Sequence, residues 1–177
     1  MTGILCSIVK EGREIVQTAQ TAEEVWREYY TPLLGEAQVS YMVEKFQSAQ
    51  AIAQQIADGY TYYLLEADGN IVGYAGVCPG DGYLFLSKLY IRKEERGRGF
   101  ASKALALVKD TAKEWGFSRI RLTVNKGNAN SIAVYKNWGF ETVDSVVTDI
   151  GEGFVMDDYV MELNLTKKVN NLSNSDF

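Results

Sequence analysis

The sequence predicts a single α/β (α+β) domain built on a mixed, mostly antiparallel sheet of six to seven strands flanked by helices. Two observations predict this fold class. One long segment has apolar residues that recur at helical spacing, and short runs of strand-forming residues lie before and after it. The chain has 177 residues, 46% of them hydrophobic, which is enough for one buried core. We expect the domain to span residues 1–165 and residues 166–177 to form a flexible polar tail.

Helices are expected in the first third of the chain and at two later places. Thr21 is the candidate N-cap of a first helix, which Pro32 ends, and a second helix is expected from about residue 36 to residue 58. Between residues 100 and 115, apolar residues recur every three or four positions, and lysines occupy the other face. A shorter helix is expected at 130–138, before a glycine.

The strands are predicted from short runs of aromatic and aliphatic residues bounded by turn residues. Asp68-Gly69-Asn70 and Pro79-Gly80-Asp81-Gly82 connect the first three as adjacent antiparallel strands. The long helix then joins the third strand to the fourth, which implies one right-handed parallel crossover. The predicted strands are 60–66, 71–78, 83–92, 119–125, 140–148 and 154–165.

Composition excludes several classes of function. The chain has no histidine, so Ser-His-Asp and Cys-His catalysis and His-based metal sites are excluded, and no metal is expected. A net charge of -5 argues against a nucleic-acid partner. No apolar run is long enough to span a membrane, and the first residues lack a targeting pattern, so a cytoplasmic protein is expected. Cys6 and Cys78 are expected to act as small buried hydrophobes.

Residues 96–102 are predicted to bind an anion, because they lead from a predicted strand into the long helix. The first N–H groups of a helix have no intrahelical partner and lie at the positive end of its dipole. Gly97, Gly99 and Ala101 leave room for a pyrophosphate to approach the backbone. Residues 92–103 also carry a net charge of +3. The alternative is an ordinary basic helix start after a flexible glycine loop. The dinucleotide and P-loop fingerprints are both missing, so these two competing glycine motifs are excluded.

Two segments resemble the GCN5-related N-acetyltransferases. Arg96-x-x-Gly99-x-Ala101 matches that family's Arg/Gln-x-x-Gly-x-Gly/Ala signature, with the expected strand before it and helix after it. Residues Asn128 to Phe140 look like the family's Asn, Ala, Tyr and Gly-Phe segment at the usual spacing. The resemblance covers roughly residues 60–163, and the acidic hairpin at 149–159 looks most like that of bacterial small-amine and polyamine acetyltransferases.

The resemblance implies acetyl-CoA as cofactor and direct attack of a primary amine on its thioester in a ternary complex. The amine would belong to a small molecule or a peptide. Tyr135 is the implied catalytic acid for the departing thiolate, and Leu89 and Ile91 would pair with the pantetheine arm as a neighbouring strand does. The implied cofactor-binding residues are Leu89, Tyr90, Ile91, Arg96, Gly97, Arg98, Gly99, Phe100, Ala101, Ser102, Asn128 and Lys136.

The general base and the acceptor site are less defined. Ser87 lies where some relatives place an acid, which favours a water relay over a side-chain base. A cationic amine could be received by Tyr29, Tyr30, Tyr41 and the acidic hairpin, or these could simply be a polar turn beside core aromatics. A homodimer is expected because relatives often dimerise, and a non-catalytic acyl-CoA-binding sensory module is the alternative function. The acidic candidates for the base are Glu66, Glu141, Asp157 and Asp158.

Overall fold

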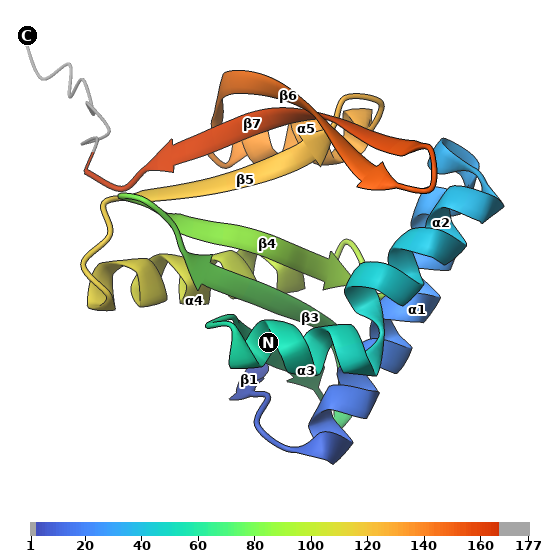
Figure 1. Ribbon diagram of the computed structural model, residues 1–177. Coiled ribbons are helices and arrows are strands. Elements are labelled where there is room, and N and C mark those ends of the chain that lie inside the picture. Colours follow the sequence, from blue (N-terminus) through green and yellow to red (C-terminus); the bar gives the residue numbers. More distant parts are fainter. Residues whose placement is uncertain (1–2, 167–177) are drawn as a thin grey trace, which may run out of the picture.

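The computed structural model describes residues 3–166, and its strands form one twisted sheet with helices on both faces (Figure 1). The seven strands lie in the order β1-β2-β3-β4-β5-β7-β6. Among the strands of residues 3–166, only the β4–β5 pair is parallel, which confirms the mixed sheet and its single crossover. Of the predicted polar tail, all but Thr166 lies outside the described residues. The strands are β1 (Leu5–Ile8), β2 (Thr61–Ala67), β3 (Asn70–Pro79), β4 (Leu84–Ile91), β5 (Arg119–Asn125), β6 (Glu141–Gly151) and β7 (Phe154–Asn164).

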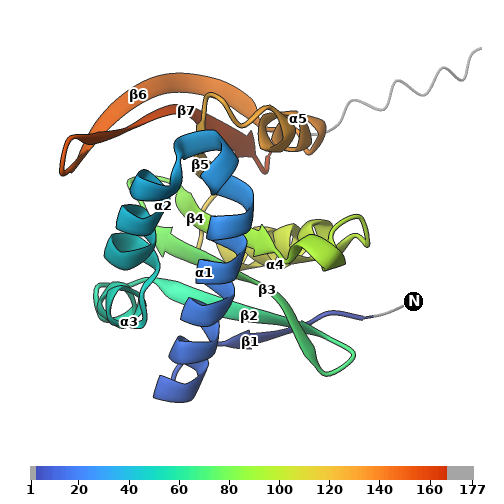
Figure 2. The same cartoon turned by 90° about the vertical axis from the view of Figure 1, so that its right-hand side faces the viewer.

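The helices cover the two faces of the sheet unequally (Figure 2). On one face, Tyr62 and Leu64 of β2 pack with residues of α1 and α3, whereas Tyr63 and Leu65 point the other way into the core beneath α4. Alternate side chains of β2 point to opposite faces of the sheet, and both sets are buried. The helical elements are α1 (Gly12–Leu34), α2 (Glu36–Met42), the π-helical turn η1 (Val43–Gln47), α3 (Ala49–Ala57), the 3-10 turn η2 (Lys93–Glu95), α4 (Phe100–Glu114) and α5 (Ala129–Asn137).

The first helix differs from the sequence prediction at its beginning. Thr21 is not an N-cap: it is buried within α1, and its hydroxyl donates to the Gln17 carbonyl at 2.9 Å. The helix begins nine residues earlier, at Gly12, where the Glu14 carboxylate accepts the backbone N–H of Glu11 at 3.1 Å. Pro32 lies inside the last turn, and the helix ends at Gly35, whose φ of 84° favours glycine.

Strand β1 was not predicted, because it has only four residues and little alternation. It pairs with β2 at the edge of the sheet, with Leu5 opposite Glu66. The second half of the chain follows the prediction closely, and α4 and β5 lie where the periodicity places them. The sequence thus predicts the part of the sheet that surrounds the crossover better than its edges.

Strands β4 and β5 pair over a short distance and then diverge (Figure 1). Within the described chain their register contains only Leu84 with Ile120 and Phe85 with Arg121. Strand β4 also bulges at Ser87, because Val77 of β3 pairs with Leu86 and Gly76 with Lys88. The C-terminal half of β4 therefore has a backbone edge that β5 does not cover.

Candidate functional site

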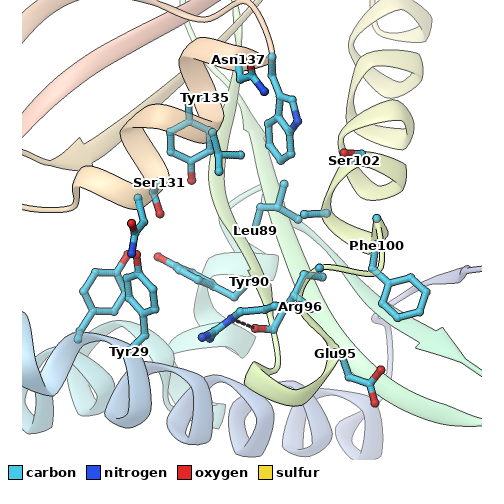
Figure 3. Close-up of a pocket in the computed structure, with 18 residues that line it drawn as sticks. Tyr29, Leu89, Tyr90, Glu95, Arg96, Phe100, Ser102, Ser131, Tyr135 and Asn137 are labelled. Atoms are coloured by element: carbon cyan, nitrogen blue, oxygen red, sulfur yellow. Dashed lines mark hydrogen bonds between the residues drawn. The ribbon is translucent and has the colours of Figure 1, made fainter.

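A cavity of about 540 Å³ lies between the end of β4, the start of α4, and helices α1 and α5 (Figure 3). Most of the residues singled out by sequence meet here. Arg98, Asn128 and Lys136 are not among its lining residues. The predicted residues that line it are Leu89, Tyr90, Ile91, Arg96, Gly97, Gly99, Phe100, Ala101, Ser102 and Tyr135.

The start of α4 presents free backbone donors to this cavity. Gly99 is its N-cap with a φ of 80°, a left-handed conformation, and no side chain caps the helix. The first intrahelical bond is donated by the Lys103 N–H to the Gly99 carbonyl at 3.2 Å. The N–H groups of Phe100, Ala101 and Ser102 precede it and have no intrahelical acceptor. Three such donors at the start of a helix are suited to an anion.

The basic side chains around this terminus are mostly paired with acids, which corrects the electrostatic expectation from sequence. Three of the five basic residues behind the local charge of +3 form ion pairs with carboxylates. Arg96 makes a two-point contact with Glu28 at 2.8 and 3.1 Å. Its guanidinium also donates to the Ile91 carbonyl at 3.0 Å. An anion at this terminus would therefore meet backbone donors more than free side-chain charge. The pairs are Arg92–Glu24, Arg96–Glu28 and Arg98–Glu95.

Tyr135 enters the cavity from α5, with its hydroxyl turned toward Tyr90 (Figure 3). Its ring packs against Trp138 and Phe140 at centroid distances of 6.0 and 5.8 Å. Burial raises the pKa of the Tyr135 phenol above its usual value. The group is therefore protonated at neutral pH and able to donate a proton or a hydrogen bond.

Asn128 supports α5 from outside the cavity lining. It is the N-cap of α5, where its Oδ1 accepts the Ser131 N–H at 3.2 Å and the Tyr29 hydroxyl at 2.5 Å. This arrangement fixes the start of the helix that carries Tyr135. Lys136 lies on the exposed surface of the same helix.

A second cavity of about 230 Å³ adjoins the first. It lies between the first three helices on one side and β4, β5 and β7 on the other. Tyr30, Leu89, Tyr90 and Tyr135 line both cavities, so the two are adjacent at these residues. A molecule in one cavity would therefore lie beside a molecule in the other.

Among the four acidic candidates for a base, Asp158 lines the second cavity. It is 4% exposed, and its Oδ1 has no hydrogen-bond partner in the described part of the chain. Burial, and then the neighbouring charge of Asp157, raise the pKa of Asp158 to about 6. Asp157 instead pairs with Lys126 at 2.7 Å. Glu66 and Glu141 lie at other hollows of the surface.

Lys88 is a residue that the sequence analysis missed. It lies on β4 at the second cavity, is 6% exposed, and has a pKa that burial lowers to about 7. Its Nζ donates to Gln55 Oε1 at 2.6 Å and to the Phe46 carbonyl at 3.3 Å, and also contacts the Tyr62 hydroxyl. By simple alternation, Lys88 falls in line with Leu84 and Leu86, where an apolar residue is expected. The bulge at Ser87 instead turns Lys88 to the opposite face of the sheet, toward Tyr62.

The predicted acceptor residues are only partly brought together. Tyr30 lines both cavities and Tyr29 the first. Tyr41 lines neither and donates to the Ile150 carbonyl at 2.5 Å. The hairpin at 149–159 places just Met156 and Asp158 in the second cavity. Of the acidic residues of this hairpin, which were expected to surround the acceptor, just Asp158 lines the cavity.

The diverging strands, the uncapped helix terminus and the adjoining cavities define a member of the acetyltransferase (GNAT) family. The model of that family matches residues 19–140, and the chain belongs to the family. Among the residues that the structure describes, no helix has the length and apolar character needed to cross a membrane.

Named relatives are also acetyltransferases. The uncharacterized N-acetyltransferase YjgM of Escherichia coli K12 is 33% identical over 90 residues, which are 49% of this chain and 54% of YjgM. A probable spermine N(1)-acetyltransferase of Bacillus subtilis subsp. natto is 30% identical over 83 residues, 42% of this chain and 55% of that protein. The matches thus span about half the length of these relatives. The PaiA N-acetyltransferase of Thermoplasma acidophilum, crystallised with coenzyme A, shares the fold with a TM-score of 0.75 at 19% identity, covering 90% of this chain and 99% of that one.

Proposed function

We propose that this chain is an acetyl-CoA-dependent N-acetyltransferase that moves an acetyl group onto a primary amine of a small molecule or peptide. The observation that carries the proposal is the meeting of two cavities at Leu89, Tyr90 and Tyr135. One cavity lies against the free N–H groups of α4, and the other is smaller and holds buried ionisable groups. The first suits a phosphate-bearing cofactor, and the second suits the acceptor.

Two features of the chain fit acetyl-CoA, whose thioester would supply the acetyl group. The N–H groups of Phe100, Ala101 and Ser102 would bind its pyrophosphate. The uncovered edge of β4 near Leu89 and Ile91 would hydrogen-bond the pantetheine arm as an added strand does. Arg98 and Lys136, at the surface around this cavity, would contact the nucleotide, and Asn128 would act by holding α5. Coenzyme A bound to the PaiA protein supports this choice of cofactor.

Tyr135 and Asp158 would carry the proton transfers. The attacking amine must first lose its ammonium proton, and Asp158 is a buried carboxylate that would accept it directly or through a water. Tyr135, held protonated by burial, would donate to the departing thiolate. Holding both reactants against Leu89 would supply much of the acceleration. A cytoplasmic location and a homodimer remain predictions, and light scattering of the purified chain tests the dimer.

The experiment that tests this function is calorimetric titration with acetyl-CoA, followed by thiol-release assays with polyamines, amino acids, amino sugars and peptides. We expect binding and turnover with at least one amine class. Binding without any turnover would favour the non-catalytic acyl-CoA-binding module. The absence of binding would contradict the proposal altogether.

A further inference from the structure

We infer that the acceptor amine carries a carboxylate, as an amino acid does, and that Lys88 binds this carboxylate while Asp158 receives the amine. The inference rests on the proposed function and names its substrate class. Its basis is that the second cavity holds one buried lysine and one buried aspartate, neither of which forms an ion pair in the described chain.

Lys88 is not needed to satisfy the polar groups around it. The Tyr62 hydroxyl already donates to Gln55 Oε1 at 2.5 Å, and Gln55 Nε2 donates to the Phe46 carbonyl at 3.1 Å. In the described chain, the hydrogen bonds of Lys88 thus all go to neutral groups that bond one another. Burying an ammonium group without a carboxylate is unfavourable. A ligand carboxylate would supply the missing charge with a charge-assisted hydrogen bond.

Asp158 is in the opposite position. Its Oδ1 lacks a hydrogen-bond partner among residues 3–166, and the cation beside it, Lys126, pairs with Asp157. An incoming ammonium group would complete its hydrogen bonding. Asp158 on β7 and Lys88 on β4 belong to strands that β5 separates in the sheet, so they contribute to the cavity from different sides of β5.

The charge of the cavity favours an amino acid over a polyamine. A diamine bound to Asp158 would bring a second cation toward Lys88, where like charges repel. A carboxylate at that place would instead favour the charged form of Lys88, whose pKa burial otherwise lowers.

The test compares each primary-amine protein amino acid, and ornithine, with the amine that lacks its carboxylate. Ornithine and putrescine, and lysine and cadaverine, are two such pairs. Thiol release with acetyl-CoA gives kcat/KM for each compound. We expect the preferred amino acid to exceed its decarboxylated partner by at least about tenfold, the effect of one hydrogen bond between charged groups.

Variants assign the effect to Lys88. Lys88→Met should lower kcat/KM for the preferred amino acid at least about tenfold, mainly through KM, and bring it close to that of the plain amine. Lys88→Arg keeps the charge and should restore part of the preference. Lys113→Met changes an exposed lysine of α4 and serves as the matched control.

A binding measurement separates this inference from the proposed function. Thermal unfolding is recorded with each amino acid and each plain amine in the presence of coenzyme A. Protection by an amino acid that Lys88→Met abolishes supports the inference even if no acetyl transfer occurs. Equal or better turnover of the plain amines overturns the inference and leaves the proposed function intact. Neither protection nor turnover overturns both.

Discussion

Tyr135 lies where the two cavities meet, and its chemistry follows from its burial. The rings of Trp138 and Phe140 pack against it, and burial raises the pKa of a phenol that is already protonated at neutral pH. A protonated hydroxyl between acceptor and cofactor sites suits a general acid. A tyrosine is equally common in an ordinary aromatic core, so the assignment of Tyr135 as an acid depends on its position and not on its residue type.

Tyr135→Phe should therefore slow acetyl transfer by about 10²- to 10⁴-fold, since it removes the proton donor and keeps the packed ring. The dissociation constant for acetyl-CoA, measured by calorimetry, should change little. Tyr41→Phe is the matched control, because Tyr41 lines neither cavity. Unchanged turnover in Tyr135→Phe would remove the residue from the acid role.

Asp158 makes a second prediction at the level of a single residue. A base works only when it is deprotonated, and the pKa of Asp158 is raised to about 6. The kcat/KM of the wild-type chain should therefore rise with pH through about 6. Asp158→Asn should lose this limb and most of the activity. Asp157→Asn should keep the limb but move it to lower pH, because the charge of Asp157 helps raise the pKa of Asp158. A limb that persists in Asp158→Asn would assign it to another group.

Helix α4 shows how an element supplies chemistry that no side chain provides. Its N-terminus is capped by no side chain, and the neighbouring basic residues pair with acids of α1 and η2. The loop therefore contributes mainly backbone donors, and a glycine at its N-cap keeps their approach open.

Gly99 and Gly116 allow a test of that role, because they flank the two ends of α4 with φ near 80° and open space around each. Replacing either by Val should cost about 1–2 kcal/mol of stability, since a β-branched residue is strained in this conformation. Cofactor affinity should fall only in Gly99→Val, whose side chain would enter the cavity. Similar affinities in the two variants, measured by calorimetry, would contradict a phosphate loop at Gly99.

The sequence predicts an element well when its signal lies within a few neighbouring residues. The helix at 100–115 was predicted because its periodicity changes within a few residues of a glycine loop. Thr21 was misread as a cap because a threonine before Glu23 and Glu24 looks the same inside a helix as at its start. Lys88 was missed because sequence shows that a strand alternates, but not which charged residue the fold buries.

The whole molecule arranges these pieces around one opening in the sheet. Strands β4 and β5 separate after two paired positions, α4 lies on one face, and α1 to α3 close the other. The second cavity lies within this arrangement, so its ionisable groups are buried by the entire fold. Their desolvation must then appear in the stability of the protein as well as in its activity.

The pKa of Lys88 predicts whether stability rises or falls with pH, and over which pH range. Its pKa is lowered to about 7 in the folded chain, against an ordinary value of 10.5. Between these values the unfolded chain binds more protons, so the folded state gains stability as pH rises, by up to about 1.4 kcal/mol per unit. Below about pH 7 the amine is charged in both states, and the full penalty remains.

Lys88→Met removes the buried amine while its neighbours stay hydrogen-bonded to one another. We expect the variant to be more stable than the wild type near pH 6.5 to 7 and this advantage to shrink by about 2–3 kcal/mol between pH 7.5 and 9.5. Urea unfolding at several pH values measures the difference, and exposed Lys113→Met should show no such trend. A difference that stays constant with pH would mean that Lys88 remains charged throughout, and its amine would then be held by a partner in the folded chain itself.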